Sequence, residues 1–425
     1  MRSAPAVGWE DGGVPVGEGV TGPGVVVRGR VVTPDEVIED GVVAVDGAGI
    51  HWVGPASQAP EPWLAGPPTA DTILPGLVDI HCHGGGGASF PDATSPDEVA
   101  AGAAEHLRHG TTSLVGSLVT AAGDVLAQRA ALLADAVEAG ILAGIHAEGP
   151  FLSYERRGAQ SPDHLVAGDP ALVRRLVEAS RGTLVTMTVA PEVPGVVAPP
   201  DDVLAALVEG GAVPSIGHTD GSAEQAEAAI ARAVALLAGH PRRPTATHLF
   251  NGMRPLHHRE PGPVAACLAA AARGELVVEL VADGTHLADA TVRAVFDLVG
   301  PDAIALVTDA MAAAGLGDGD YQLGPMRVRV ADGVARLVTA DGSAGAIAGG
   351  VAHLLDVVRC TVAAGVPLVA AVRAASVTPA GVVGLTGRGG LVAGHRADLV
   401  VVDGDLRPRR VMREGRWAYD EAASA

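Results

Sequence analysis

Short apolar runs separated by turn-forming residues mark both ends of the chain. Near the N-terminus, runs rich in valine and isoleucine are broken by turn signals such as Asp46-Gly47, a pattern typical of β-hairpins. Similar runs return at 397–404 and 411–417. Two β-rich ends on either side of a long middle predict a small β-sandwich domain built from both termini.

The middle of the chain alternates between short apolar runs and alanine-rich stretches with helical spacing. The apolar runs are 73–80, 112–118, 143–147, 184–189, 213–216, 245–249, 276–281 and 304–307. Helical stretches include 96–109, 124–139, 222–237 and 289–298, and we expect Ser95 and Asp289 to cap the first and last of these. Strand–helix alternation repeated eight times predicts an α/β protein with a (β/α)8 TIM-like barrel. A doubly wound open sheet is the structural alternative.

These patterns divide the chain into a core and its flanks. The expected segments are a flexible tail at 1–22, a small β domain at 23–73 and 388–425, and a barrel at 74–387. The tail is predicted from its many glycines and prolines and its lack of any periodic pattern.

Histidine and carboxylate side chains follow six of the eight apolar runs, at the point where each run ends. They are His81, His83, Glu148, His218, His248, His286 and Asp309. Barrel enzymes collect their catalytic groups at the C-terminal ends of the strands, so we expect these seven side chains to meet at one mouth. This placement favours the barrel over the open sheet.

The residue types in this set are those of a divalent-metal site. Imidazole and carboxylate groups suit Zn or Fe(II), and such an ion lowers the pKa of a bound water to about 7. His81 and His83 are two residues apart, so they project from the same side of a strand end. The other histidines carry no such placement: His106 and His109 are interpreted as surface or packing residues, and His353 is given no role.

Composition removes several classes of function. The chain has 29 cationic side chains against 49 acidic ones, a net charge of -20, which argues against nucleic acid or a membrane surface as partner. All 29 cations are arginine. Without lysine the chain cannot be a P-loop NTPase, form a Schiff base with pyridoxal phosphate, or bridge two metals with a carboxylated lysine.

The cysteines and the N-terminus indicate the compartment. Three cysteines, Cys82, Cys267 and Cys360, are too few and too sparse for a disulfide framework, which fits a reducing environment. The first residues include acids and lack a continuous apolar stretch, and no long uncharged apolar span occurs in the chain. We therefore expect a cytoplasmic protein with no signal peptide and no membrane span.

Several motifs give a resemblance that goes beyond residue types. The first and last of them, 75–84 and 394–400, are general, and 146–152 and 247–253 are much more specific; the others are 216–219, 283–286 and 308–310. Together they resemble the amidohydrolase superfamily, and within it the deacetylases of phosphorylated N-acetyl amino sugars. The resemblance covers roughly residues 24–420.

The resemblance implies a metal centre with one or two Zn or Fe(II) ions per subunit. Glu148, His218 and His248 would hold the main ion. His81 and His83 would hold a second ion, with Glu148 as the bridge between them.

The resemblance also implies a reaction, the hydrolysis of the N-acetyl group of N-acetyl-D-glucosamine 6-phosphate to glucosamine 6-phosphate and acetate. Asp309 would act as general base towards a metal-activated water and then as general acid towards the departing amine. His286 would donate a hydrogen bond to the carbonyl oxygen and stabilise the oxyanion.

Substrate contacts are implied as well. Asn251 and the Gly252 backbone would bind the phosphate, together with Arg259 contributed across a homodimer interface. The chain departs from the family pattern at Gln160, where a histidine usually faces the sugar, and at Gly350, where a serine is usual. Gln160 can still donate and accept hydrogen bonds to the sugar.

Two other classes of function remain open from the sequence. One is a different amidohydrolase, such as an N-acyl-amino-acid deacylase or a base deaminase, which would need no arginine for a phosphate. The other is a catalytically inactive amidohydrolase-like scaffold, a class that loses metal ligands, whereas this chain keeps them all.

Overall fold

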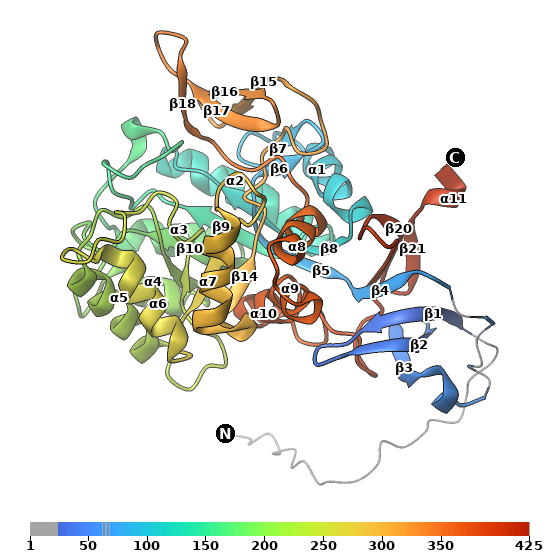
Figure 1. Ribbon diagram of the computed structural model, residues 1–425. Helices are drawn as coiled ribbons and strands as arrows, with labels where there is room; N and C mark the ends of the chain where they lie inside the picture. The colour runs from blue at the N-terminus through green and yellow to red at the C-terminus, as the bar shows by residue number, and fades with distance from the viewer. Residues whose placement is uncertain (1–23, 62, 64–65, 68, 425) are drawn as a thin grey trace, which may run out of the picture.

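The computed structural model describes residues 24–61, 63, 66–67 and 69–424 (Figure 1). The tail predicted at 1–22 lies outside these residues. Among the described helices, none is both long enough and apolar enough to cross a membrane.

Eight parallel strands form the centre of the molecule, in the order of the chain from β5 to β14. They are β5 (Leu77–Cys82), β8 (Thr111–Leu118), β9 (Gly144–Glu148), β10 (Leu184–Val189), β11 (Val213–Ile216), β12 (Thr245–Ala246), β13 (Val277–Leu280) and β14 (Ile304–Leu306). The segment after β14 returns to β5: the Asp309 N–H donates to the His81 carbonyl at 2.9 Å, and the His83 N–H donates to the Ala310 carbonyl at 2.7 Å. These bonds close the barrel at its mouth, so the predicted barrel is confirmed and the open sheet is excluded.

Helices surround the barrel strands (Figure 1). They are α1 (Pro96–Arg108), α2 (Gly123–Glu138), α3 (Pro170–Ala179), α4 (Val203–Glu209), α5 (Ala223–Leu236), α6 (Gly262–Ala272), α7 (Asp289–Val299), α8 (Leu354–Ala363), α9 (Leu368–Ala374) and α10 (Val377–Val383), with α11 (Glu421–Ser424) at the C-terminus. Three short 3-10 turns lie at η1 (Ala56–Gln58), η2 (Pro162–His164) and η3 (Pro301–Ala303). Ser95 caps α1 as predicted, because its side chain accepts a hydrogen bond from the Glu98 N–H. The predicted cap at Asp289 is wrong: Ala288 precedes α7, and Asp289 lies in its first turn, where its charge favours the helix N-terminus.

Both ends of the chain contribute to one seven-stranded sheet, as expected for a β domain built from both termini. Its order is β21 (Arg416–Asp420), β20 (Pro408–Arg413), β19 (Leu399–Val402), β4 (Thr72–Pro75), β1 (Val25–Val32), β2 (Val37–Asp46) and β3 (Gly49–Pro55). The apolar run 73–80 divides at Gly76 between this sheet and the barrel. A side chain at Gly76 would lie 2.2 Å from the Thr112 hydroxyl, so only glycine fits where the two sheets meet.

A four-stranded antiparallel sheet lies over the barrel mouth, at the top of the view in Figure 1. Its strands are β15 (Gly319–Leu323), β16 (Met326–Ala331), β17 (Val334–Val338) and β18 (Ala344–Ile347), and a two-stranded ribbon, β6 (Gly84–Gly85) and β7 (Ala88–Ser89), lies below it. On the inner face of the four-stranded sheet, Leu323, Val328 and Ala335 pack against Met311 and Ala312, which follow the last barrel strand. The sequence analysis missed this sheet, because its strands lie inside the stretch assigned to the barrel.

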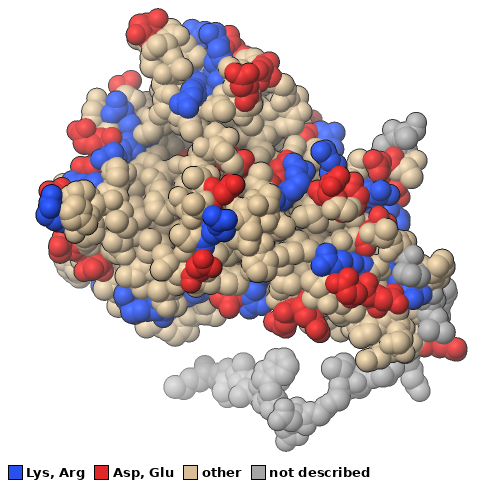
Figure 2. Space-filling view, viewed as in Figure 1, with Lys and Arg blue, Asp and Glu red and all other residues tan. Residues whose placement is uncertain are grey.

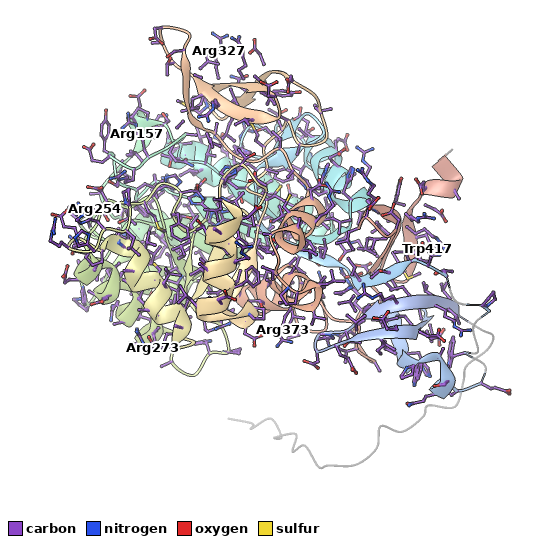
Figure 3. All side chains as sticks on the ribbon, in the orientation of Figure 1. Arg157, Arg254, Arg273, Arg327, Arg373 and Trp417 are labelled. Carbon is purple, nitrogen blue, oxygen red and sulfur yellow. The ribbon has the colours of Figure 1, made fainter. Side chains whose placement is uncertain are left out.

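The surface carries mixed charge despite the large net negative charge. On the face shown in Figure 2, arginines lie beside acidic side chains. The Arg329 guanidinium, for example, lies 2.7 Å from the Asp320 carboxylate. On the terminal sheet, the Arg410 guanidinium stacks 3.6 Å above the ring of Trp417, which Figure 3 labels.

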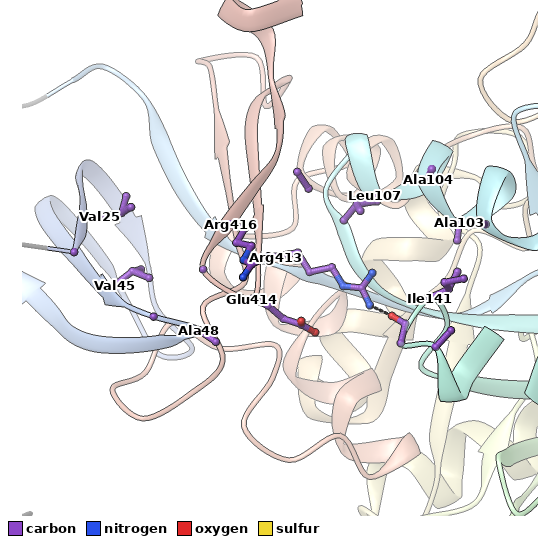
Figure 4. A pocket seen from close by; sticks show the side chains of 17 residues that line it. Val25, Val45, Ala48, Ala103, Ala104, Leu107, Ile141, Arg413, Glu414 and Arg416 are labelled. Carbon is purple, nitrogen blue, oxygen red and sulfur yellow. Dashed lines mark hydrogen bonds between the residues drawn. The ribbon is translucent and has the colours of Figure 1, made fainter. Parts of the chain in front are cut away.

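A groove of about 970 Å³ separates the terminal sheet from α1 and α2 (Figure 4). Small apolar side chains such as Ala103, Ala104 and Ile141 line it, and the Arg413 guanidinium crosses it to donate to the Gly140 carbonyl. Among the described residues that line this groove there is no histidine. The groove therefore lacks the chemistry predicted for the site, which lies at the barrel mouth instead.

Candidate active site

Glu148 is the centre of the polar cluster at the barrel mouth. It ends β9, and only 3% of its surface is exposed. Its Oε1 atom lies 2.8 Å from Nε2 of His218 and 2.9 Å from Nε2 of His248. The ligand-type atoms of these three residues all lie within 4.8 Å of one another, a separation that one metal ion can bridge.

The other oxygen of Glu148 faces a second group. Oε2 lies 3.2 Å from Nε2 of His83 and 3.8 Å from Nε2 of His81, and Asp309 Oδ1 lies 3.2 Å and 3.5 Å from the same two nitrogens. These four residues form a second set within 4.8 Å. Because Glu148 belongs to both sets, the donors fit a divalent-metal centre at the mouth.

Three residues of the cluster have a left-handed backbone. The φ angles of His218, His248 and Asp309 are 46°, 28° and 48°, and each residue lies just past the end of a barrel strand. A non-glycine residue in this region costs about 1–3 kcal/mol and persists only where the surrounding structure enforces it. The strain turns each side chain into the mouth and is typical of functional sites.

Both carboxylates of the cluster are held ionised. Burial alone would raise the pKa of Glu148, but the charge of His218 and hydrogen bonds from the histidines hold that pKa well below its usual value. Burial acts the same way on Asp309, where the charge of His81 and a bond to His83 lower the pKa. An ionised carboxylate can bind a cation or accept a proton.

Glu279 is a functional candidate that the sequence analysis missed. It is fully buried on β13, and its Oε2 lies 3.0 Å from Nδ1 of His81 and 3.2 Å from the backbone N of His248. Its other oxygen, Oε1, has no hydrogen-bond partner among the described residues. A carboxylate on one ring nitrogen orients a histidine so that the other nitrogen faces the metal. The signal was an acid inside an otherwise apolar strand.

His286 is oriented by Asp283, to which the sequence analysis gave no role. Nδ1 of His286 lies 2.8 Å from the Asp283 carboxylate, and the His286 N–H donates to the same group at 2.9 Å. Burial lowers the pKa of His286, but the bond to Asp283 and its charge outweigh burial and raise it. The imidazole is thus prepared to donate a hydrogen bond from its other nitrogen.

A cavity of about 270 Å³ joins these side chains. Its polar lining consists of His83, Glu148, Gln160, His218, His248, Asn251, His286 and Asp309. Leu323, Ile347 and Ala348 of the four-stranded sheet and its exit close the cavity from above. The barrel supplies the chemistry, and the added sheet supplies an apolar wall.

Asn251 and Gly252 lie on the cavity wall, in the loop after β12. The Asn251 amide donates to the His248 carbonyl at 3.2 Å. Gly252 has a φ of 59°, and a side chain there would lie 2.7 Å from Nδ1 of His218. Glycine is therefore required at 252 to let the His218 ring approach.

The two departures from the family pattern have structural explanations. Gln160 donates to Oε2 of Glu148 at 2.7 Å and accepts from the Thr120 N–H at 2.8 Å, so its amide orients Glu148 at the cavity wall. A side chain at Gly350 would lie 2.3 Å from the Thr308 carbonyl oxygen. With this backbone, serine would not fit at 350.

Arg259 lies apart from the other predicted residues. It is exposed in the turn before α6 and is not among the residues that line the cavity. Arg254, which lies earlier in the same loop and is labelled in Figure 3, forms an ion pair with Asp220, with 2.9 Å between the guanidinium and the carboxylate. Within one chain, the structure therefore brings all the predicted metal and catalytic residues together but leaves Arg259 outside.

Comparisons with known proteins agree with this geometry. The amidohydrolase family matches residues 72–420. An N-acetylglucosamine-6-phosphate deacetylase from Lysinibacillus sphaericus is 33% identical over 81% of this chain and 84% of its own length, and the human enzyme of that name is 33% identical over 82% and 84%.

A solved structure gives the same result. The N-acetyl-D-glucosamine-6-phosphate deacetylase from Mycobacterium smegmatis, a mutant in complex with N-acetyl-D-glucosamine 6-phosphate, is 41% identical. It superposes with a TM-score of 0.84 over 93% of this chain and 100% of that one. The chain therefore belongs to the amidohydrolase family, among relatives that are N-acetylglucosamine-6-phosphate deacetylases.

Proposed function

We propose that this enzyme hydrolyses N-acetyl-D-glucosamine 6-phosphate to glucosamine 6-phosphate and acetate. The observation that carries the proposal is the sharing of Glu148 between two groups of histidines, with Asp309 and His286 on the same cavity. The substrate is inferred from the relatives, which are N-acetylglucosamine-6-phosphate deacetylases.

The metal centre takes Zn or Fe(II), one or two ions per subunit. Glu148, His218 and His248 would hold one ion, and His81 and His83 would hold a second together with Glu148. When bound, a divalent ion supplies Lewis-acid activation of water and of the amide carbonyl. Glu279 and Gln160 fix the orientation of His81 and Glu148 through the bonds described above.

Asp309 moves the proton. Its carboxylate accepts a proton from the water whose oxygen attacks the acetyl carbonyl carbon, and it then gives that proton to the amine nitrogen as the C–N bond breaks. His286, held by Asp283, donates a hydrogen bond to the carbonyl oxygen as negative charge develops there.

Phosphate recognition involves two subunits. Asn251 and the Gly252 backbone bind the phosphate from the chain that holds the metal. Arg259 is exposed and lies outside its own cavity, so in a homodimer it reaches the phosphate in the partner's site. The free cysteines support a cytoplasmic location.

The function is tested by measuring acetate release from N-acetylglucosamine with and without a 6-phosphate. We expect rapid, metal-dependent release from the phosphorylated sugar and much slower release from the neutral one. Equal rates on both would remove the phosphate from the proposal, and no release from either would reject the deacetylase.

Arg259→Ala tests the phosphate contact. A charge-assisted hydrogen bond contributes about 1.5–3 kcal/mol, and 1.4 kcal/mol is a factor of ten, so kcat/KM on the phosphorylated sugar should fall about 10- to 100-fold. The unphosphorylated sugar should be affected much less. Arg273→Ala is the matched control, because Arg273 is exposed near the end of α6 and pairs with Glu275 on the surface.

Mixing of two impaired variants tests whether the site is shared. Arg259→Ala chains mixed with Asp309→Asn chains should regain activity, because one site of a mixed dimer combines an intact Asp309 with the partner's intact arginine. If mixed dimers form and remain inactive, Arg259 serves its own subunit. The deacetylase assignment survives that outcome, and the shared phosphate site does not.

A further inference from the structure

A buried aspartate and a buried threonine join the first and last strands of the barrel. β5 and β14 stand at the two ends of the sheet order, and a single-residue bridge between Cys82 and Ala310 connects them near the mouth. Asp79 lies three residues before Cys82 on β5, and Thr308 follows β14. Both side chains are fully buried, and they are bonded to each other. The sequence analysis gave neither residue a role.

The Asp79 carboxylate accepts three hydrogen bonds at this closure. Its Oδ2 accepts from the Thr308 hydroxyl at 2.6 Å. Its Oδ1 accepts from two backbone N–H groups, that of Thr308 at 3.4 Å and that of His81 at 3.3 Å. A buried carboxylate costs free energy unless hydrogen bonds offset the loss of water. Here those bonds connect one carboxylate to a candidate metal ligand and to the residue before Asp309.

The Thr308 hydroxyl makes bonds in two directions. Its hydrogen is donated to Asp79, and its oxygen accepts from the Ala310 N–H at 3.1 Å. The second bond spans Asp309, as in the turns that serine and threonine side chains form with the backbone two residues on. Asp309 has a φ of 48°, a conformation that persists in an aspartate only where its surroundings enforce it. The hydroxyl therefore holds the turn at Asp309, and Asp79 fixes the hydroxyl.

The same turn is held from its other sides by the backbone. The Asp309 N–H donates to the His81 carbonyl at 2.9 Å, and the Asp309 carbonyl accepts from the Gly350 N–H at 2.7 Å. With these groups bonded, the backbone at 309 decides where the carboxylate points, and Oδ1 lies 3.2 Å from Nε2 of His83. A change in the turn would therefore move the carboxylate within the cavity.

We propose that Asp79 is a positioning residue for the reaction, which acts through the Thr308 hydroxyl to hold Asp309 in the orientation that accepts and returns the proton. The inference rests on the proposed function, because it takes Asp309 as the base. A misplaced base slows proton transfer and leaves the binding of the sugar phosphate unchanged. The loss is therefore expected in kcat, with KM close to the wild-type value.

Three threonine variants of the full-length enzyme test the hydroxyl. Thr308→Val keeps the shape of the side chain and should lower kcat about 10- to 100-fold, with KM and bound metal as in the wild type. Thr308→Ser keeps the hydroxyl and should restore most of kcat. Thr361→Val is the matched control, because Thr361 is also fully buried and its hydroxyl donates within α8 to the Val357 carbonyl. An unchanged kcat in Thr308→Val, or an equal loss in Thr308→Ser, overturns the proposal.

A double-mutant cycle tests whether Asp79 acts through Asp309. Asp79→Asn places an amide NH2 group where only acceptors fit, so kcat should fall about 10- to 100-fold in the wild-type background. In the Asp309→Asn background the same change should lower the residual kcat by less than about twofold, because the step that it supports is already lost. Equal losses in the two backgrounds overturn the proposal, and Asp79 then supports the barrel as a whole.

The Thr308 variants decide the question if Asp79→Asn does not fold. They also separate this inference from the function on which it rests. Near-normal kcat in Asp309→Asn would reject the base and this inference together. A large loss in Asp309→Asn with wild-type kcat in Thr308→Val would keep the base and overturn only the role of Asp79.

Discussion

The histidine cluster at the barrel mouth and an outer cluster of Glu105, His109 and His353, between α1 and α8, neutralise their carboxylates in different ways. At the mouth, the ion-pair partners of Glu148 among the described residues are all histidines. Between α1 and α8, Glu105 also pairs with Arg108, and Asp356 pairs with Arg359 at 2.8 Å. The mouth therefore requires protonated imidazoles or a bound cation, whereas the outer cluster already has permanent positive charge.

The backbone conformations of the two clusters also differ. His218, His248 and Asp309 hold left-handed φ angles, whereas His109 and His353 have ordinary values of -99° and -89°. Strain is stored at the mouth and not at the outer cluster. Backbone strain at the mouth lowers stability and positions reactive side chains. The outer cluster joins two helices without such strain.

The largest expected effect separates the two clusters by activity. Asp309→Asn keeps the size of the side chain but removes the base, so turnover should fall by about 10²–10⁴ with bound metal roughly retained. Asp356→Asn makes the same change at the outer cluster and should keep near-normal turnover. Initial rates of acetate release and metal analysis on both variants make the comparison. Near-normal turnover by Asp309→Asn would end the catalytic assignment of the mouth.

The metal count at the mouth gives the next effect. His81→Ala combined with His83→Ala should lower bound metal by one ion per chain and leave partial activity, because Glu148, His218 and His248 still hold the first ion. Metal content after dialysis, compared with the wild type under the same conditions, measures the change. If the count does not fall, the mouth holds a single ion and these two histidines are not ligands.

A smaller effect is expected one layer behind the mouth. Glu279→Gln keeps a hydrogen-bonding group near His81 but removes the charge, so metal affinity should fall about 10- to 100-fold. Competition with a chelator measures that affinity, and Glu275→Gln, a change at a partly exposed residue just before β13, is the control. If both variants retain wild-type affinity, Glu279 does not position a ligand.

The smallest expected effect concerns the stability that the outer cluster gives to the fold. His353→Gln should lower the free energy of unfolding by about 1–3 kcal/mol, because Glu105 would lose a buried partner. Urea denaturation of the metal-free protein measures the change, and turnover at saturating metal should stay near the wild-type value. A large loss of turnover with unchanged stability would reverse the distinction between the two clusters.

The sequence by itself determined the barrel and most of the mouth. Repeated apolar runs fixed the strand positions, and residues such as Glu148, His218 and Asp309 could be placed because they follow strands whose C-terminal ends must converge. The convergence is a property of the parallel barrel, so a one-dimensional pattern was sufficient to predict it. The resemblance then supplied roles that residue type alone left open.

Only the tertiary structure decided the contacts that depend on distant segments. Glu279 lies inside an apolar run, so its sequence context gave it no role. Its bond to His81 joins residues 198 positions apart and depends on how their two strands are aligned in the barrel. Glu105 and His353 are 248 residues apart and follow no strand, so no periodicity connects them. Local sequence determines which way a side chain points from its own element. Which side chain it meets is set by packing between elements, because that partner can come from anywhere in the chain.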